Sequence, residues 1–198
     1  DFYRNVECIF YSFYKNMCFT FNQMIYAAFS HFSGTTMYDS VLYTIFNVFF
    51  TSVPIVVYSG YDRDVSLKSM MDKPELYDMD GKKKWIQSYP RFILNLFTGL
   101  VHSFIAFFIS YGFCYPFQSN DGMGVTKQEF AATVYFCVVT IVNIHMASIC
   151  SYWTWMHWFF IIGSVMIFPL IFIIIDAIGM SMTIRHVSIR WLRMPQPW

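Results

Sequence analysis

Polar side chains line one face of an otherwise apolar segment near the start of the chain. On a helix that turns by about 100° per residue they fall within one arc of roughly 160°, and they are Ser12, Lys15, Asn16, Thr20, Asn22 and Gln23. A lysine inside a membrane span costs at least about 2.5–3.5 kcal/mol on insertion scales, and such residues usually face a pathway. The stripe therefore predicts a polar groove for a substrate head group. The alternative is a helix-packing contact in which Lys15 snorkels or bonds backbone carbonyls.

The next apolar segment repeats the pattern. Its polar residues share an arc of roughly 140°, and they are Ser40, Thr44, Asn47, Thr51 and Ser52. Two neighbouring helices with one polar stripe each most economically face one another or a shared wet cavity. Pro54 cannot donate a hydrogen bond to the carbonyl of Phe50, so a kink is expected just beyond these polar residues.

The composition indicates the kind of protein in which these segments lie. Hydrophobic residues make up 57% of the 198 residues and charged residues 13%, against about 25% charged in an average soluble domain. Apolar stretches long enough to cross a hydrocarbon core of about 30 Å recur at 6–30, 40–59, 91–115, 129–150 and 154–182. We therefore expect an all-α polytopic transmembrane helix bundle, an integral multi-pass protein of the plasma membrane or an endomembrane. Its expected surroundings are membrane lipids, and no nucleic-acid partner is predicted.

The distribution of Lys and Arg predicts the orientation. Seven of the thirteen lie in 61–91, whereas 31–39 has none and 116–128 has only Lys127. Basic loops stay on the cytoplasmic side, so the long loop is predicted to be cytoplasmic and the other two exoplasmic. The chain then divides into 1–60, two spans with an exoplasmic loop; 61–90, a cytoplasmic loop; 91–150, two further spans; 151–184, the last apolar stretch; and 185–198, a basic tail.

Six short strings, in this order, carry a family resemblance. They are "YSFYKN" at 11–16, "FSGTTMYDS" at 32–40, "NVFFTSVP" at 47–54, "DKPELY" at 72–77, "VNIHMA" at 142–147 and "SYWTW" at 151–155. Each is weak alone, but as an ordered set they resemble the carboxy-terminal half of the membrane domain of the type IV P-type ATPases, the phospholipid flippases. The resemblance begins at the family's fifth span. It implies a ten-span pump that moves phospholipid from the exoplasmic to the cytosolic leaflet and is driven by ATP.

The resemblance also implies roles for particular residues. The family's Lys-Asn pair on the lipid head-group route falls on Lys15 and Asn16, which could attract a phosphate or carboxylate and hydrogen-bond to it. Asn47, Thr51 and Ser52 fall on secondary candidates of the sixth span, where residues that merely join helices are at least as common.

No catalytic residue and no cofactor is expected in this chain. The sequence has no Asp-Lys-Thr-Gly phosphorylation motif. ATP and Mg²⁺ are implied only for the complete pump, whose remaining domains belong to the same or a separate chain. A two-span accessory β-subunit, if present, is expected near 31–39 or 116–126.

The last apolar stretch departs from the family pattern. Residues 153–168 resemble the start of the family's ninth span, and 168–187 resemble the end of its tenth. Five spans that start in the cytoplasm leave the basic tail outside, against the positive-inside rule. Pro169 would also interrupt the helix. We therefore predict a break in the chain around 166–169, two separate ninth- and tenth-span remnants, and a cytoplasmic tail.

Other residues with chemical potential have simpler interpretations. His102 and His145 lie in spans without a second ligand at helical spacing, so packing is favoured over a metal site. Asp176 is expected to have a helix-end or packing role, and Trp153, Trp155 and Trp158 an aromatic belt. Three functions stay open: the membrane portion of a flippase, a non-catalytic flippase-derived structural subunit of a larger complex, and an unrelated channel or carrier.

Overall fold

All the described elements are helices. A computed structural model describes residues 2–47, 52–61, 76–114, 124–150, 153–178 and 187–193. The helices are α1 (Phe2–Phe29), α2 (Ser40–Ile45), α3 (Ser52–Tyr61), α5 (Leu76–Cys114), α6 (Lys127–Ile149), α7 (Trp155–Ile178) and α8 (Val187–Arg193). Among these described residues, three segments are long and apolar enough to cross a membrane: Tyr89–Cys114, Lys127–Ile149 and Trp155–Ile178. α1 has a span's length, 28 residues, but carries the polar stripe. The prediction of an all-α, multi-pass transmembrane bundle is confirmed.

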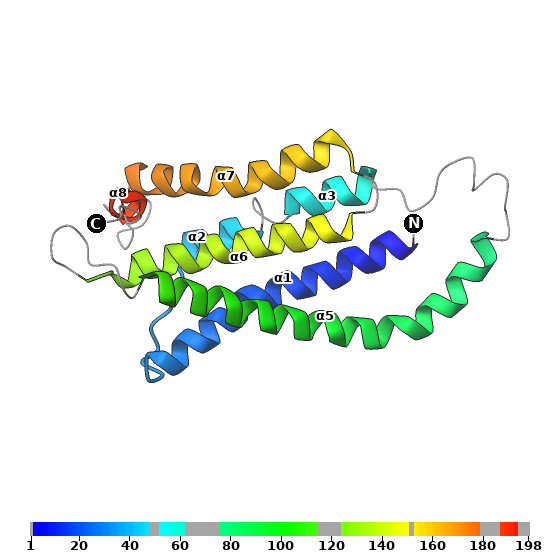
Figure 1. Ribbon diagram of the computed structural model, residues 1–198, viewed down its shortest axis with the longest axis horizontal. Coiled ribbons are helices and arrows are strands. Elements are labelled where there is room, and N and C mark those ends of the chain that lie inside the picture. The colour runs from blue at the N-terminus through cyan, green and yellow to red at the C-terminus, as the bar shows by residue number, and fades with distance from the viewer. Residues whose placement is uncertain are drawn as a thin grey trace.

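The long helices lie side by side with α6 in the middle (Figure 1). α5 packs along α1 on one side of α6, and α7 packs against α3 and α6 on the other. The inner positions of α6 include Val134, Val138, Val139 and Val142, which are completely buried. A bundle in lipid is held by such close packing, because the hydrocarbon solvent is as apolar as the side chains themselves.

Aromatic side chains anchor the short helix α2 to this centre. The ring of Phe19 stacks between Tyr38 and Phe46, with ring centres 4.3 and 4.2 Å apart. Tyr135 of α6 meets Phe19 edge-on, and its hydroxyl donates to the carbonyl of Leu42 at 2.9 Å. The buried phenol thus has the partner that it needs.

The second apolar stretch contains two described helices. α2 ends at Ile45 and α3 begins at Ser52, so that Pro54 is the third residue of α3. Residues 48–51 lie outside the described residues. The kink expected at Pro54 falls partly on them and stays a prediction.

α5 begins before the predicted span. It starts at Leu76 and continues through Pro90 to Cys114. Helix therefore occupies the second half of the stretch predicted as the loop 61–90. The membrane-like part of α5, which starts at Tyr89, agrees with the predicted 91–115.

The predicted break at 166–169 is wrong, because α7 is one continuous helix from Trp155 to Ile178 with Pro169 inside it. A proline within a helix costs about 3 kcal/mol, and its neighbours supply packing that offsets this cost. Phe168 is completely buried, and its ring stacks on Tyr135 at 5.0 Å between ring centres. The 24 residues of α7 span about 36 Å, a length that a modest tilt accommodates in a membrane.

The expected position of the tail is also corrected. The indole N–H of Trp191 in α8 donates to Thr133 Oγ1 in the second turn of α6, at 3.0 Å. Lys127, at that same end of α6, lies over the ring of Tyr26 near the end of α1. α8 is thus at the end of the bundle that carries the 31–39 loop, opposite to the start of α1 (Figure 1). With α7 unbroken, the chain passes along the bundle an odd number of times. The tail therefore lies at the end of the bundle opposite to the start of α1.

Candidate polar groove and the three-helix cluster

The polar stripe of α1 is divided between the interior and the surface. Lys15 is buried, with 7% of its surface exposed, whereas its neighbour Asn16 and Thr20 one turn later are exposed. Successive residues differ by about 100° around a helix, so the edge of the packed face runs between Lys15 and Asn16. The structure does not bring the two residues to one face.

Three further members of the stripe have structural partners. Ser12 and Asn22 donate to backbone carbonyls one turn earlier, those of Cys8 and Cys18, each at 2.8 Å. Gln23 Oε1 accepts a hydrogen bond from the backbone N–H of Met37 at 2.9 Å. Gln23 therefore ties the 31–39 loop back onto α1.

The second-span candidates that the structure describes, Asn47 and Ser52, lie just after α2 and at the start of α3. Asn47 and Ser52 are both half-buried, and the Ser52 hydroxyl donates to the Asn47 carbonyl. Thr51 lies outside the described residues. α3 packs against α1, so Ser52 belongs to a helix that neighbours the one that holds Lys15.

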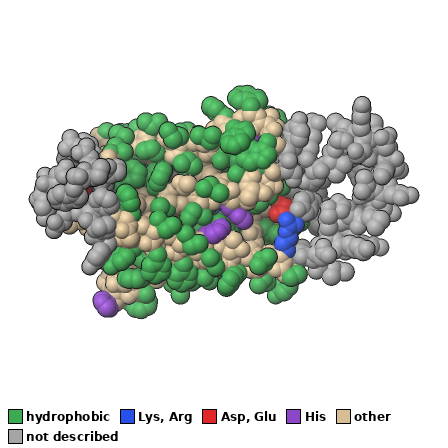
Figure 2. Space-filling view, viewed as in Figure 1, with side chains coloured by type: hydrophobic (Ala, Val, Ile, Leu, Met, Phe, Trp, Pro, Cys, Tyr) green, Lys and Arg blue, Asp and Glu red, His purple; other side chains and the backbone are tan. Residues whose placement is uncertain are grey.

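The surface around these helices suits lipid. Apolar side chains cover most of the described part of the face in Figure 2, where acidic and basic side chains are visible together at one place. The largest exposed apolar groups on α5 and α7 include Leu94, Ile109, Leu170 and Ile174. In water such a surface would be an aggregation liability, whereas hydrocarbon solvates it.

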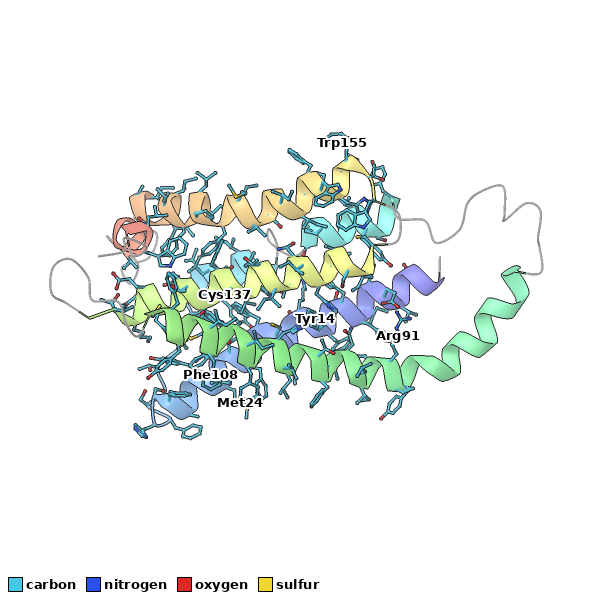
Figure 3. The ribbon with its side chains drawn as sticks, in the orientation of Figure 1. Tyr14, Met24, Arg91, Phe108, Cys137 and Trp155 are labelled. Carbon is cyan, nitrogen blue, oxygen red and sulfur yellow. The ribbon has the colours of Figure 1, made fainter. Side chains whose placement is uncertain are left out.

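A cluster of Tyr14, His102 and His145 joins three helices and was not predicted from the sequence. Tyr14 is completely buried, and its hydroxyl lies 2.5 Å from His102 Nδ1 on α5. The ring of His145 on α6 stacks against Tyr14 with 3.9 Å between ring centres. Figure 3 shows Tyr14 where these helices meet. Spacing within one helix could not predict the cluster, because each member comes from a different helix.

Close backbone approach lets these helices meet. A Cβ atom added at Gly99 of α5 would lie 3.1 Å from the carbonyl oxygen of Tyr14. Small residues at such contacts allow membrane helices to pack backbone to backbone. About two turns closer to the N-terminus of α5, Arg91, which is labelled in Figure 3, pairs with the buried Glu7 of α1 at 2.9 Å.

A second buried polar contact joins α6 to α7. The Ser164 hydroxyl donates to Asn143 Oδ1 at 2.9 Å, and Asn143 Nδ2 donates to the carbonyl of Val139 at 2.8 Å. Asn143 is completely buried. It belongs to the string "VNIHMA", and its role here is to join two spans.

Asp176 holds α8 at the end of α7. Its carboxylate accepts hydrogen bonds from the backbone N–H of Ser188 at 3.1 Å and from the Ser188 hydroxyl. A carboxylate at the start of a helix is favourable, because the first N–H groups of a helix have no intrahelical acceptors. This agrees with the expected helix-end role.

Comparison with known proteins gives consistent results over the whole chain. Residues 1–198 match the family model described as "Phospholipid-translocating P-type ATPase C-terminal". The chain is 38% identical over 159 residues to phospholipid-transporting ATPase IC of Xenopus tropicalis, which covers 80% of this chain and 13% of that protein. It is 33% identical over 169 residues to the probable phospholipid-transporting ATPase IM of Homo sapiens, covering 85% of this chain and 14% of the relative. It is also 33% identical over 163 residues to phospholipid-transporting ATPase 10 of Arabidopsis thaliana, covering 82% of this chain and 14% of the relative.

Proposed function

Because the chain belongs to the phospholipid-translocating P-type ATPases, in the carboxy-terminal region of that family, we propose that it is membrane machinery of an ATP-driven lipid flippase. Phospholipid would move from the exoplasmic to the cytosolic leaflet. The chain spans about one seventh of the relatives' length, 13–14%, so ATP hydrolysis and lipid selection by the whole pump are part of the proposal.

The observation that supports this function best is the buried Lys15 beside an exposed Asn16 on α1. A cation at membrane depth is costly unless it faces a polar path or a partner. An ammonium suits the phosphate of a lipid, and the Asn16 amide can both donate and accept hydrogen bonds. Lys15 would stand at the protein side of the head-group route, and Asn16 would meet the head group from the open face.

Asn47 and Ser52 extend the proposed route to the second span. Both side chains are half-buried, α3 packs against α1, and Thr51 would add a hydroxyl there. The head group would then pass between α1 and these residues, while the acyl chains stay in the surrounding lipid.

ATP and Mg²⁺ belong to other parts of the proposed pump. No three His, Cys, Asp or Glu side chains gather within the described residues, and a Mg²⁺–phosphate site is normally built on carboxylates. A two-span accessory subunit would contact the 31–39 loop, where Phe32 is 78% exposed.

The test is ATP-dependent transport by the full-length protein in liposomes. A fluorescent phospholipid is added to both leaflets, and an impermeant quencher reports how much of it lies in the outer leaflet. This amount should change when ATP is added, and the direction of the change depends on the orientation of the pump in the liposome. Movement towards the leaflet on the ATP-hydrolysing side is expected. Lipid movement that does not depend on ATP, or that runs in the opposite direction, contradicts the proposal.

A second candidate function is a non-catalytic, flippase-derived structural subunit of a larger complex. The unbroken α7 favours it, because one helix stands where the pump family's pattern requires the ends of two spans. Under this alternative, the protein purified from its native membrane would assemble with partners but form no phosphorylated intermediate with ATP. If the same polypeptide forms an acid-stable phosphoenzyme, then this alternative is wrong and the protein is a pump.

A further inference from the structure

Asn16, Thr20 and Gln23 follow one another along the same side of α1. At about 100° per residue they fall within an arc of roughly 60°, and they are spaced by about 6 and 4.5 Å along the helix axis. Asn16 and Thr20 are exposed, and Gln23 is half-buried. Met24, the residue after Gln23, marks this level of α1 in Figure 3. The row therefore continues from the Lys15–Asn16 pair towards the end of α1 that carries the 31–39 loop.

The side-chain amide of Gln23 has a defined orientation. Its Oε1 atom lies 2.9 Å from the backbone nitrogen of Met37. A backbone N–H can only donate, so the atom that faces it is the amide oxygen, and Nε2 keeps two N–H donors. Among the described residues these two donors have no hydrogen-bond partner. Gln23 therefore holds the 31–39 loop with one atom and offers donors to a ligand with another.

The hydroxyl of Thr20 is available, unlike those of other threonines in these helices. The hydroxyls of Thr98 and Thr140 donate to backbone carbonyls one turn earlier, at 2.9 and 2.8 Å, a bond that threonine often makes inside a helix. Thr20 is exposed, and within the described part of the chain its hydroxyl has no such partner. Thr20 thus adds an O–H donor one turn from Gln23.

The chemistry of the row suits a ligand that is rich in acceptors. Amide and hydroxyl donors follow the Lys15 ammonium along this side of α1. Glu7 is the one acidic residue in the described part of α1, and its carboxylate is paired with Arg91. The ammonium of a lipid would meet no unpaired carboxylate on this helix. The oxygens of a phosphodiester, in contrast, can accept hydrogen bonds from each of these donors.

We propose that Thr20 and Gln23 form an outer binding position for the phosphodiester group of a phospholipid, ahead of Lys15 and Asn16 on the head-group route. This inference rests on the proposed function, and it adds the position that the lipid reaches first from the side of the 31–39 loop. The phosphodiester is common to different phospholipids. The outer position therefore recognises the substrate class and does not choose among head groups.

The hydrogen bond to Met37 links the outer position to the 31–39 loop. Met37 is buried, with 3% of its surface exposed, so its backbone N–H is a fixed point of that loop. A displacement of the loop would release Oε1 of Gln23 and let the amide, with its Nε2 donors, turn. Placement of the loop and affinity for the phosphodiester are therefore coupled through this one side chain.

The substitution Gln23→Glu separates ligand binding from the hold on the loop. A glutamate keeps an oxygen that accepts the Met37 N–H, but it replaces the two N–H donors with a second acceptor and adds negative charge. Full-length protein in detergent micelles, without ATP, is titrated with dihexanoyl phosphatidylcholine and with dihexanoylglycerol, which lacks the phosphate. Displacement of a fluorescent short-chain phosphatidylcholine measures both affinities. The wild type should bind the phosphatidylcholine at least about tenfold more tightly than the dihexanoylglycerol.

In Gln23→Glu the affinity for phosphatidylcholine should fall about tenfold while the unfolding temperature stays unchanged. Thr20→Val should weaken binding about threefold, because it removes one hydroxyl donor at nearly constant volume. Thr140→Val is the matched control, since that hydroxyl is already bonded to a carbonyl of α6, and its affinity should equal that of the wild type. Wild-type affinity in both Gln23→Glu and Thr20→Val, or equal binding of the two probes by the wild type, overturns the proposal.

Failure of this inference and failure of the proposed function give different results. If the wild type transports lipid with ATP but neither variant changes phosphatidylcholine affinity, then the pump stands and the outer position is wrong. If Gln23→Glu weakens phosphate-dependent binding in a protein that transports no lipid with ATP, then the outer position stands and the pump is wrong.

Discussion

The carboxylate of Glu7 and the guanidinium of Arg91 lie 2.9 Å apart and join α1 to α5. The two partners are unequally exposed, because 6% of the Glu7 side chain and 53% of the Arg91 side chain are accessible. The arginine thus brings its charge to a carboxylate that the helices have largely removed from solvent. Such a pair adds little to the net stability of the fold. Removing only one partner is nevertheless costly, because the charge of the other partner is then left buried without compensation.

Arg91→Ala should therefore destabilise the bundle by about 1–2 kcal/mol, between the values typical of exposed and buried ion pairs. Adding Glu7→Gln should recover most of the loss, because the uncompensated charge is then removed. Thermal unfolding of the single and double variants in one detergent measures both effects. Equal destabilisation by Arg91→Ala with and without Glu7→Gln would show that the pair is not the cause.

Gly99→Ala should also disturb the contact between α1 and α5. The added methyl group would stand 3.1 Å from the Tyr14 carbonyl oxygen and 3.2 Å from its ring, and a backbone atom cannot move aside as a side chain can. We expect a loss of about 1–3 kcal/mol, the usual cost of overpacking. Gly112 and Gly163 are matched controls, because a Cβ there meets nothing within 4 Å.

The controls should change stability in the opposite direction. Alanine is favoured over glycine inside a helix by about 1 kcal/mol, so Gly112→Ala should be neutral or slightly stabilising. Thermal unfolding temperatures of the variants give the comparison. If Gly99→Ala behaves like Gly112→Ala, then the close approach of α1 and α5 is not present in solution.

Lys15→Ala and Asn16→Ala should reduce lipid-stimulated ATP hydrolysis of the intact pump while leaving assembly and basal hydrolysis near normal. The reason is the proposed contact of both side chains with the lipid head group. A shift of the half-maximal lipid concentration by roughly tenfold corresponds to about 1.4 kcal/mol, a reasonable value for one charge-assisted hydrogen bond. Lys127→Ala, which removes an exposed lysine from the start of α6, is the control. If lipid stimulation is unchanged in both Lys15→Ala and Asn16→Ala, then these side chains do not line the head-group route.

The position of α8 can be measured from either side of the membrane. In a variant without reactive native cysteines, Ser33→Cys and Leu192→Cys should react with an impermeant reagent from the same side. Both residues are exposed, and the structure places α8 at the end of the bundle that carries the 31–39 loop. Labelling of the two positions from opposite sides would mean that the chain crosses once more between them, as the family pattern suggested.

Residue patterns predicted the elements whose signals are local. α6 was expected at 129–150 and occupies Lys127–Ile149, where Thr126 and Glu129 form a capping box of the kind that marks helix starts. The buried position of Lys15 relative to Asn16 was not predictable in the same way. An arc of polar residues shows which side of α1 is polar. The helices that pack against α1 determine where its buried face ends.

The remaining differences have a common physical origin in contacts distant along the sequence. α7 is continuous through Pro169, beside which Phe168 stacks against Tyr135 of α6. The meeting of His102 and His145 depends on the pairing of α5 with α6. Spacing rules within a single helix contain no information about either contact.

The central position of α6 limits how this membrane domain can move. It is packed by α1 and α5 on one side and by α3 and α7 on the other, and several of its side chains are fully buried. Any tilt of α6 would open all of these contacts at once, so we expect α6 to be the least mobile helix of the bundle. α5 packs mainly on α1 and α6, and it is fastened to α1 by the Gly99 approach and the Glu7–Arg91 pair. We therefore expect α1 and α5 to move as one unit in any rearrangement of the bundle.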